Sequence, residues 1–259
     1  MSVKPKKSLG QNFLNDKNII DKIIDASEIN FSDEVLEIGP GKGSLTRFII
    51  SKRPKKIHVI EKDETLVNIL REEYLDKINI INKDVLEIPN EFYSGKKFLI
   101  LGNLPYNIST KILSNLCLNN KLKVSRMILM FQKEVAERIC AEVNSSDYSR
   151  ITVLSKWKFN IKKIIDVKPN SFFPKPKVYS TVLKFTPKQK IYKIKDPKNL
   201  EKITKVFFNQ RRKMIKKPIN ILFKNSKFNY EKFKINPSDR PQNIDIDKYL
   251  KIVSEFESL

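Results

Sequence analysis

The chain has 259 residues, of which 51 are Lys or Arg and 29 are Asp or Glu, so its formal net charge is +22. This length supports a sizeable core in one large domain or two unequal ones, and a hydrophobic content of 40% excludes a wholly disordered chain. Two cysteines and one histidine exclude a disulfide scaffold and a cysteine-rich zinc module, and no metal site is expected. The basic start has no apolar segment behind it, and no apolar run approaches the roughly 20 residues of a membrane span. We therefore expect a cytoplasmic protein without a membrane partner.

The positive charge is denser toward the C-terminus. Residues 1–186 carry 32 basic and 21 acidic side chains, and residues 187–259 carry 19 and 8, so each part has a net charge of +11. Such an excess suggests a polyanionic partner. Because 42 of the 51 basic residues are Lys, a compositional bias with a solvated surface is the alternative. We favour nucleic acid, although charge alone does not decide between the two.

Short apolar runs alternate with helical patterns over the first 186 residues. Four isoleucines at helical spacing predict a helix within residues 15–27. Further helices are expected at 44–51, after Glu61 to about 74, from 109, at 133–143 and from 148. Strands are expected at 34–38, 56–60, 78–82, 98–102, 127–131, 161–167 and 178–185. Strands that alternate with helices imply an α/β fold with a parallel, doubly wound sheet.

Beyond residue 187 the pattern contains helical periods only, of which residues 200–217 are the clearest. We place a boundary near residue 186. Residues 1–186 would form the α/β domain, and residues 187–259 would form a small helical domain.

A glycine-rich turn, Gly39-Pro-Gly41-Lys-Gly43, follows the first of these strands. Glycine lets the backbone turn tightly and lets a ligand approach without interference from a Cβ atom. The spacing is GxGxG rather than the GxGxxG of dinucleotide folds, because residue 44 is Ser. A structural tight turn would also explain the glycines, so this motif is weak by itself.

Polar residues follow the next three strands in order. Glu61, Asp84 and Asn103 each stand where a strand ends. Ligands bind at the carboxyl ends of strands in open α/β sheets, where one carboxylate can accept ribose hydroxyls and another an adenine amino group. Polar residues commonly end strands, but the glycine turn and these three residues make four ligand-type positions in the expected order, and together they predict an adenosine-containing cofactor. S-adenosylmethionine fits, and NAD is the competitor.

The tetrapeptide Asn103-Leu-Pro-Tyr106 carries the most specific chemistry. The lone pair of an exocyclic adenine amine is delocalised into the ring, so the amine is a poor nucleophile. The Asn103 side-chain oxygen and the Leu104 carbonyl can accept its two hydrogens and favour a more tetrahedral nitrogen. Tyr106 can stack on a base swung out of its helix. A proline-containing loop with a core tyrosine is the structural alternative.

A second aromatic source lies in residues 171–178, Ser-Phe-Phe-Pro-Lys-Pro-Lys-Val. We expect Phe172 to close the other face of the flipped base, with core packing as its alternative and Phe173 as the competing stacking residue. Lys175 and Lys177 can meet phosphates.

Six segments together resemble the small-subunit rRNA adenine dimethyltransferase family, from about residue 6 to the C-terminus. They are the runs that begin at Gly10 (GQNFL), Glu37 (EIGPGKG), Asn103 (NLPYNIS), Phe131 (FQKE), Phe172 (FFPKPKV) and Phe208 (FNQRRK). The resemblance implies a Rossmann-like, S-adenosylmethionine-dependent methyltransferase sheet of seven strands, followed by a small all-helical C-terminal domain. It implies an enzyme that dimethylates N6 of two adjacent adenosines in a hairpin loop near the 3′ end of 16S rRNA. The partner would be that rRNA in the small ribosomal subunit or its precursor, and we expect a monomer.

The resemblance also implies residue roles. The expected catalytic residues are Asn103, Leu104, Tyr106 and Phe172. The expected cofactor-binding residues are Asn12, Leu14, Gly39, Gly41, Glu61, Asp84 and Asn103. The expected RNA-binding residues are Lys175, Lys177, Arg211, Arg212 and Lys213, the last three lying on or beside the helix that begins near residue 200.

Three other functions remain to be weighed. Macrolide-resistance methyltransferases dimethylate an adenine of large-subunit rRNA by the same chemistry, but Leu104 and the Gln210-Arg-Arg-Lys213 run favour the small-subunit enzyme. A non-enzymatic RNA-binding or transcription factor would not need the intact set of Gly39, Glu61, Asp84 and Asn103. This sequence has no catalytic His and no Lys/Tyr pair of the kind that an NAD-dependent dehydrogenase would need.

Overall fold

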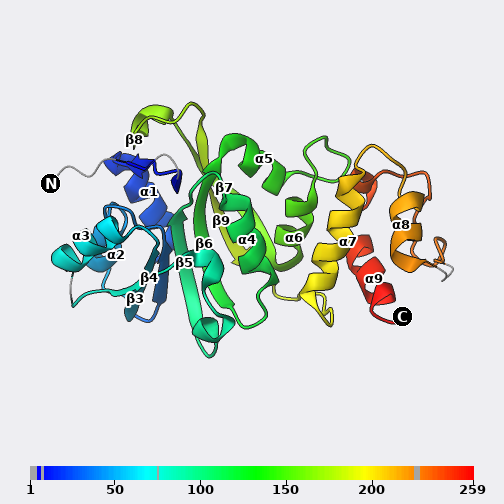
Figure 1. Cartoon of the computed structure of the whole chain (residues 1–259), viewed down its shortest axis with the longest axis horizontal. Coiled ribbons are helices and arrows are strands. Elements are labelled where there is room, and N and C mark those ends of the chain that lie inside the picture. The colour runs from blue at the N-terminus through cyan, green and yellow to red at the C-terminus, as the bar shows by residue number, and fades with distance from the viewer. Residues whose placement is uncertain (1–4, 7–8, 75, 225–227) are drawn as a thin grey trace. The chain divides into compact units, whose positions relative to one another are not determined.

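The computed structural model describes residues 5–6, 9–74, 76–224 and 228–259, and Figure 1 traces its helices and strands. The chain forms two compact units. The first comprises residues up to Leu116 with Lys121–Ala136 and Asn160–Pro187, and the second comprises Cys117–Asn120, Glu137–Phe159 and Lys188–Leu259. The second unit therefore takes in residues 137–159 besides the C-terminal segment that the sequence pattern set apart.

The first unit is built on a sheet of seven strands in the order β4-β3-β2-β5-β6-β9-β7. Their bounds are β2 Glu34–Ile38, β3 Lys56–Glu61, β4 Asn79–Asn82, β5 Lys97–Asn103, β6 Lys123–Gln132, β7 Phe159–Val167 and β9 Ser180–Pro187. All seven predicted strands are present. The pairs β3–β4, β2–β3, β2–β5 and β5–β6 are parallel, so the carboxyl ends of β2, β3 and β5 meet at one edge.

The sheet is not entirely parallel, which corrects the prediction from the sequence. Strand β9 runs antiparallel to β6, with Ser180 opposite Gln132 and Phe185 opposite Met127. The start of β9 therefore lies at the edge of the sheet where β6 ends.

A two-stranded ribbon joins the N-terminal arm to a distant loop. Strand β1, Phe13–Leu14, pairs antiparallel with β8, Phe172–Phe173, so that Phe13 lies opposite Phe173 and Leu14 opposite Phe172. Side chains opposite each other in such a ladder point to the same face. Leu14 and Phe172 are both buried in the core of the unit, which identifies their face as the inner one.

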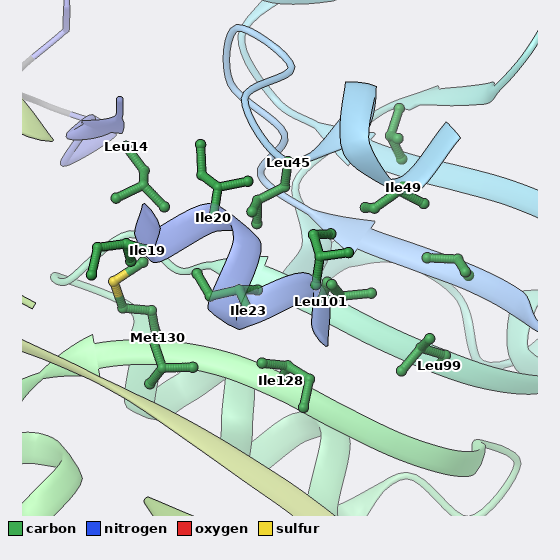
Figure 2. Packing of buried hydrophobic residues seen from close by; sticks show 14 of the residues in the cluster. Leu14, Ile19, Ile20, Ile23, Leu45, Ile49, Leu99, Leu101, Ile128 and Met130 are labelled. Atoms are coloured by element: carbon green, nitrogen blue, oxygen red, sulfur yellow. The ribbon is translucent and has the colours of Figure 1, made fainter. Parts of the chain in front are cut away.

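Helices pack on this sheet through apolar faces, of which that of α1 is rich in isoleucine. Three α-helices lie wholly in the first unit: α1 Lys17–Ser27, α2 Thr46–Ser51 and α3 Glu64–Tyr74. Two more, α4 Ser109–Leu118 and α5 Lys133–Cys140, begin in the first unit and end in the second. Figure 2 shows Ile23 of α1 beside Leu101 of β5 and above Ile128 of β6. Asp16 caps the N-terminus of α1 by accepting from the backbone N–H groups of residues 18 and 19.

The second unit is helical, apart from the first residue of β7. Its core is formed by α6 Arg150–Lys158, α7 Pro197–Asn209, α8 Lys216–Phe223 and α9 Ile246–Phe256. The continuous helix predicted over residues 200–217 was wrong, because the backbone leaves the helical conformation at Gln210 and α8 starts at Lys216. Pro218 lies in the first turn of α8, where proline is tolerated, which fits the start of a new helix at Lys216. None of the helices in the described residues is long and apolar enough to cross a membrane.

Candidate functional site

A cavity of about 210 Å³ opens where β2, β3 and β5 end, and residues of the N-terminal arm complete its wall. Nine of the residues expected at the cofactor or the target amine line it. These are Asn12, Leu14, Gly39, Gly41, Glu61, Asp84, Asn103, Leu104 and Tyr106. Glu61, Asp84 and Asn103 were expected to lie together because parallel strands end at one edge of a sheet, and all three line this cavity.

The glycine turn after β2 forms the floor of this cavity. Gly39 and Gly41 adopt φ angles of 68° and 61°, in the left-handed region that favours glycine. A Cβ atom at Gly39 would find no protein atom nearer than 3.9 Å and would project into the cavity. At Gly41 a Cβ atom would meet the Phe13 ring at 3.0 Å. One glycine thus keeps space for a ligand, and the other lets the arm pack against the turn.

Glu61, the last residue of β3, fixes the shape of the turn. Its Oε2 accepts from the Gly41 N–H at 3.2 Å, and its Oε1 accepts from the Asp63 N–H at 2.9 Å. Burial raises the pKa of Glu61, and these backbone N–H groups oppose the rise. Each carboxylate oxygen has a second lone pair, so the side chain can still accept hydroxyl groups.

Asp84 follows β4 and caps the short helix η2, Val85–Glu87. Its Oδ1 accepts from the Leu86 N–H at 2.9 Å, and its Oδ2 lies 3.0 Å from the Lys62 ammonium. Burial acts to raise the pKa of Asp84, but these two donors hold it below its ordinary value. Asp84 is therefore ionised at neutral pH and remains an acceptor at the cavity wall.

Glu37, in β2, is a buried acid in the cavity wall to which the sequence analysis assigned no role. It accepts from the Thr46 hydroxyl at 2.7 Å and is almost fully buried. Burial raises the pKa of Glu37 to about 8, the Thr46 bond opposes this shift and the Glu61 charge adds to it. At neutral pH this side chain is therefore mostly a neutral carboxylic acid.

Asn103, at the end of β5, is held by the N-terminal arm. Its Nδ2 donates to the backbone carbonyl of Asn12 at 2.8 Å. Since the amide nitrogen is engaged with the arm, the acceptor that remains for a ligand is Oδ1. The next residue, Leu104, buries its side chain, and its Cδ2 lies near the Cα of Gly102, where an added Cβ would meet it at 2.9 Å.

Tyr106 is fixed by a hydroxyl contact to β9. Its hydroxyl is bonded to the Ser180 hydroxyl at 2.5 Å, and the ring lines the cavity. Burial raises the pKa of Tyr106, so the phenol stays neutral at physiological pH. The ring is thereby oriented as a flat apolar surface and not as an ionised base.

The structure places Phe172 and Phe173 on opposite faces of the β1–β8 ribbon, and the stacking role expected of Phe172 stays a prediction. The Phe172 side chain is 4% exposed within the hydrophobic core and does not line the cavity. Phe173 points to the opposite face of the ribbon and is 58% exposed. Successive residues of a strand alternate between faces, so only one of the two phenylalanines can face outward. In this structure Phe172 is a core residue that seats Leu14.

Asp63 is the second functional candidate that the sequence analysis missed. Its buried carboxylate accepts from Lys6 Nζ at 2.6 Å and from Gln11 Nε2 at 2.8 Å, both in the N-terminal arm. It also accepts from the Thr65 N–H at 3.1 Å, at the start of α3. Burial acts to raise the pKa of Asp63, but these donors hold it below its ordinary value. The one clue to Asp63 in the sequence is its position two residues after Glu61, which is itself a predicted site residue.

The residues expected at RNA lie in two separate places. Lys175 and Lys177 are exposed in the loop between β8 and β9 of the first unit. Arg211, Arg212 and Lys213 lie in the turn between α7 and α8 of the second unit, beside α7 as expected. Arg212 and Lys213 are exposed and Arg211 is half-buried, so all three side chains can reach a phosphate.

The residues of the cavity fit S-adenosylmethionine. The open space over Gly39 admits a ligand close to the backbone, and Glu61 supplies carboxylate oxygens one strand away. Asp84, which follows the next strand of the sheet, supplies an ionised acceptor. Leu14 and Ile60 add apolar surface to the cavity wall. In the described part of the chain no three His, Cys, Asp or Glu side chains cluster as metal ligands would.

Comparison with known proteins identifies the family. The model of the ribosomal RNA adenine dimethylase family matches residues 2–258, and the chain belongs to that family. Its members are S-adenosylmethionine-dependent methyltransferases, so the chain is an enzyme of this class and that cofactor is the one it uses. The family predicted from the six sequence segments is thereby confirmed.

Individual relatives agree with this assignment. A protein of Pelagibacter ubique described as ribosomal RNA small subunit methyltransferase A is 53% identical, over all of this chain and 99% of its own length. The crystal structure of a dimethyladenosine transferase from Plasmodium falciparum is 28% identical, with a TM-score of 0.81 over 95% of this chain and 98% of that one. The 23S rRNA methyltransferase ErmE is similar in fold, with 21% identity and a TM-score of 0.68 over 95% of this chain and all of its own.

Glu37→Gln tests the neutral state of the buried acid. The folded pKa of about 8 exceeds the ordinary 4.5, so the folded chain holds a proton that the unfolded chain releases as pH rises. The free energy of unfolding should therefore fall between pH 4.5 and 8, by up to about 5 kcal/mol from this group. Hydrogen exchange of the β2 and β5 amides without cofactor measures it. Glu37→Gln should remove this slope, and a slope equal to that of the wild type would contradict the assignment.

Asp63→Asn tests the anchor of the arm. Losing the charge weakens the bonds from Lys6 and Gln11, and bonds to charged groups are worth about 1.5–3 kcal/mol. We expect faster hydrogen exchange at residues 9–14 and an affinity for S-adenosylmethionine that falls roughly 5- to 20-fold. Mass spectrometry and calorimetric titration measure the two effects. The exposed neighbour Glu64 supplies the control, Glu64→Gln, which should change neither. Unchanged exchange in Asp63→Asn would show that Asp63 does not hold the arm.

Proposed function

We propose that the chain transfers two methyl groups to N6 of each of two adjacent adenosines in a hairpin loop near the 3′ end of 16S rRNA. The substrate is the small ribosomal subunit or its precursor. The name of the Pelagibacter ubique relative supports the small subunit, and the similarity to the Plasmodium falciparum dimethyladenosine transferase supports dimethyladenosine as the product. A cytoplasmic, monomeric enzyme is part of the same proposal.

The observation that carries the proposal is the orientation of Asn103. Because Nδ2 donates to the Asn12 carbonyl, Oδ1 is the atom left to accept a hydrogen from the target amine. The Leu104 carbonyl accepts the second hydrogen. With both hydrogens held by acceptors, the nitrogen lone pair is withdrawn from the ring and becomes nucleophilic. The amine needs no deprotonation before attack, and its proton is lost afterwards.

The bound cofactor supplies an electrophilic methyl group on a sulfonium. On the protein side, Gly39 and Gly41 shape the turn beneath it, Glu61 accepts from its ribose, and Asp84 accepts from its adenine amine. Asn12 and Leu14 hold it from the arm. Tyr106 stacks on the target adenine, and its hydroxyl contact with Ser180 keeps the ring from rotating.

Large-subunit rRNA is the competing substrate, because ErmE has the same fold. The 53% identity to a small-subunit methyltransferase and the Arg211-Arg212-Lys213 run favour the small subunit. Transfer of labelled methyl groups to small subunits that lack the modification tests the choice, with large subunits as the control. Labelling of large subunits alone would overturn the proposal and favour the resistance-type activity.

Asn103→Ala should remove most of the turnover while cofactor binding survives. The side chain acts on the amine mainly in the transition state, so its loss should cost about 2–4 kcal/mol, or roughly 30- to 1,000-fold in rate. Single-turnover methyl transfer measures this rate, and calorimetry measures cofactor affinity. Asn115→Ala, at an exposed position of α4 outside the cavity, is the matched control. Near-normal turnover by Asn103→Ala would rule out its role.

Arg211→Gln combined with Arg212→Gln should weaken binding to the small subunit without changing cofactor affinity. Each lost phosphate contact should lower the slope of log affinity against log salt by about 0.7–0.9, so the pair should lower it by about 1.5. Filter binding at several salt concentrations measures this slope.

Lys55 and Lys56 provide the control for this experiment. Both are exposed at the amino end of β3, the edge of the sheet opposite the cavity. Their replacement by Gln removes the same charge and should change binding less. If the Arg211/Arg212 variant binds normally but unfolds at a lower temperature, the two arginines are structural.

A further inference from the structure

The loop from Phe173 to Tyr179 exposes an unusual amount of aromatic surface. Phe173 is 58% exposed and Tyr179 is 49% exposed, and Val178 between them is exposed as well. Among the residues that the structure describes, four aromatic side chains are at least 40% exposed, and the other two are Phe31 and Tyr192. Two of the four therefore lie within one loop of seven residues.

This loop is tied to the cavity at both ends. At its start, Phe173 lies opposite Phe13 in the β1–β8 ladder and shares its face, and the Phe13 side chain packs against the glycine turn in the cavity wall. At its end, Tyr179 precedes Ser180, whose hydroxyl is bonded to Tyr106. The Tyr179 carbonyl accepts from the Lys133 N–H at 2.9 Å, which holds the backbone there. The exposed rings therefore stand on backbone that is fixed to the site.

The charge of the loop identifies the kind of partner. Lys175 and Lys177 are exposed between the two rings, and residues 171–180 contain no acidic side chain. Aromatic rings that alternate with cations are the chemistry of single-stranded nucleic acid binding, because bases stack on the rings and phosphates meet the cations. An apolar protein partner would not require the two lysines.

We propose that Phe173 and Tyr179 form a stacking platform for unpaired nucleotides that flank the target adenosine, with Lys175 and Lys177 neutralising the phosphates of those nucleotides. This rests on the proposed function and adds a specificity element to it. Tyr106 would hold the base that is methylated, whereas the platform would hold its neighbours and so select a target within an unpaired loop. A fully paired strand could not offer its bases to these rings.

The test uses Phe173→Ala and Tyr179→Ala in the full-length enzyme. The probe is an RNA hairpin with two adjacent unpaired adenosines in its loop. Stacking is worth about 1–3 kcal/mol per base, so each variant should bind the hairpin roughly 5- to 100-fold more weakly. Phe31→Ala removes an aromatic ring that is 82% exposed in the same unit and should have no effect. Calorimetry should show unchanged affinity for S-adenosylmethionine in all three.

A second set of hairpins, in which the nucleotides beside the adenosines lack their bases, separates stacking from general damage. The affinity of the wild type for these hairpins should fall toward the affinity of the alanine variants for the intact hairpin. Tyr179→Ala should then weaken binding of these hairpins little further. Tyr179→Phe should bind the intact hairpin like wild type, because a ring is all that stacking requires.

Two results would overturn the platform. One is equal binding of the intact hairpin by wild type and both alanine variants. The other is weaker binding of whole subunits with unchanged hairpin binding, which would make the loop a contact for ribosomal protein. Failure of the wild-type enzyme to methylate small subunits would overturn the proposed function instead, and the hairpin affinities would still decide the platform.

Discussion

The hydrogen bond from Asn103 Nδ2 to the Asn12 carbonyl is the contact on which the candidate site depends. It joins two segments 91 residues apart and leaves Oδ1 as the amide atom that can accept from a ligand. The arm that supplies this carbonyl is held in turn by Asp63 through Lys6 and Gln11. A side chain that would accept from the target amine thus owes its orientation to residues that would never touch that amine.

Two opposite electrostatic environments lie side by side in this cavity. Asp84 is kept ionised by a backbone N–H and an ammonium, whereas Glu37 is kept neutral by burial beside Glu61. Bringing Glu37 and Glu61 together would be costly if both were charged, because like charges near each other disfavour ionisation. Keeping Glu37 neutral avoids placing two charges together in this wall of the cavity.

The positions of several cavity residues were predictable, because they depend only on where the strands of the sheet end. Glu61, Asp84 and Asn103 were found from the sequence since each follows an apolar run, and parallel strands end together. The choice between Phe172 and Phe173 was not predictable in that way, because it depends on the register of a two-residue ribbon formed with β1. The break at Gln210 was missed because helical periodicity continues across it. Asp63 was missed because its partners lie about 50 residues away in the sequence.

The antiparallel insertion of β9 has an evolutionary consequence. It delivers the segment from Phe173 to Tyr179 to the cavity edge from the side of β6, whereas the glycine turn and the acidic residues come from β2, β3 and β4. Length and composition between the two anchored ends, in residues 174–178, can therefore change without disturbing the residues that line the cavity. Related enzymes on this scaffold would be free to exchange one RNA target for another by remodelling a single excursion of the chain, while the chemistry of methyl transfer stayed intact.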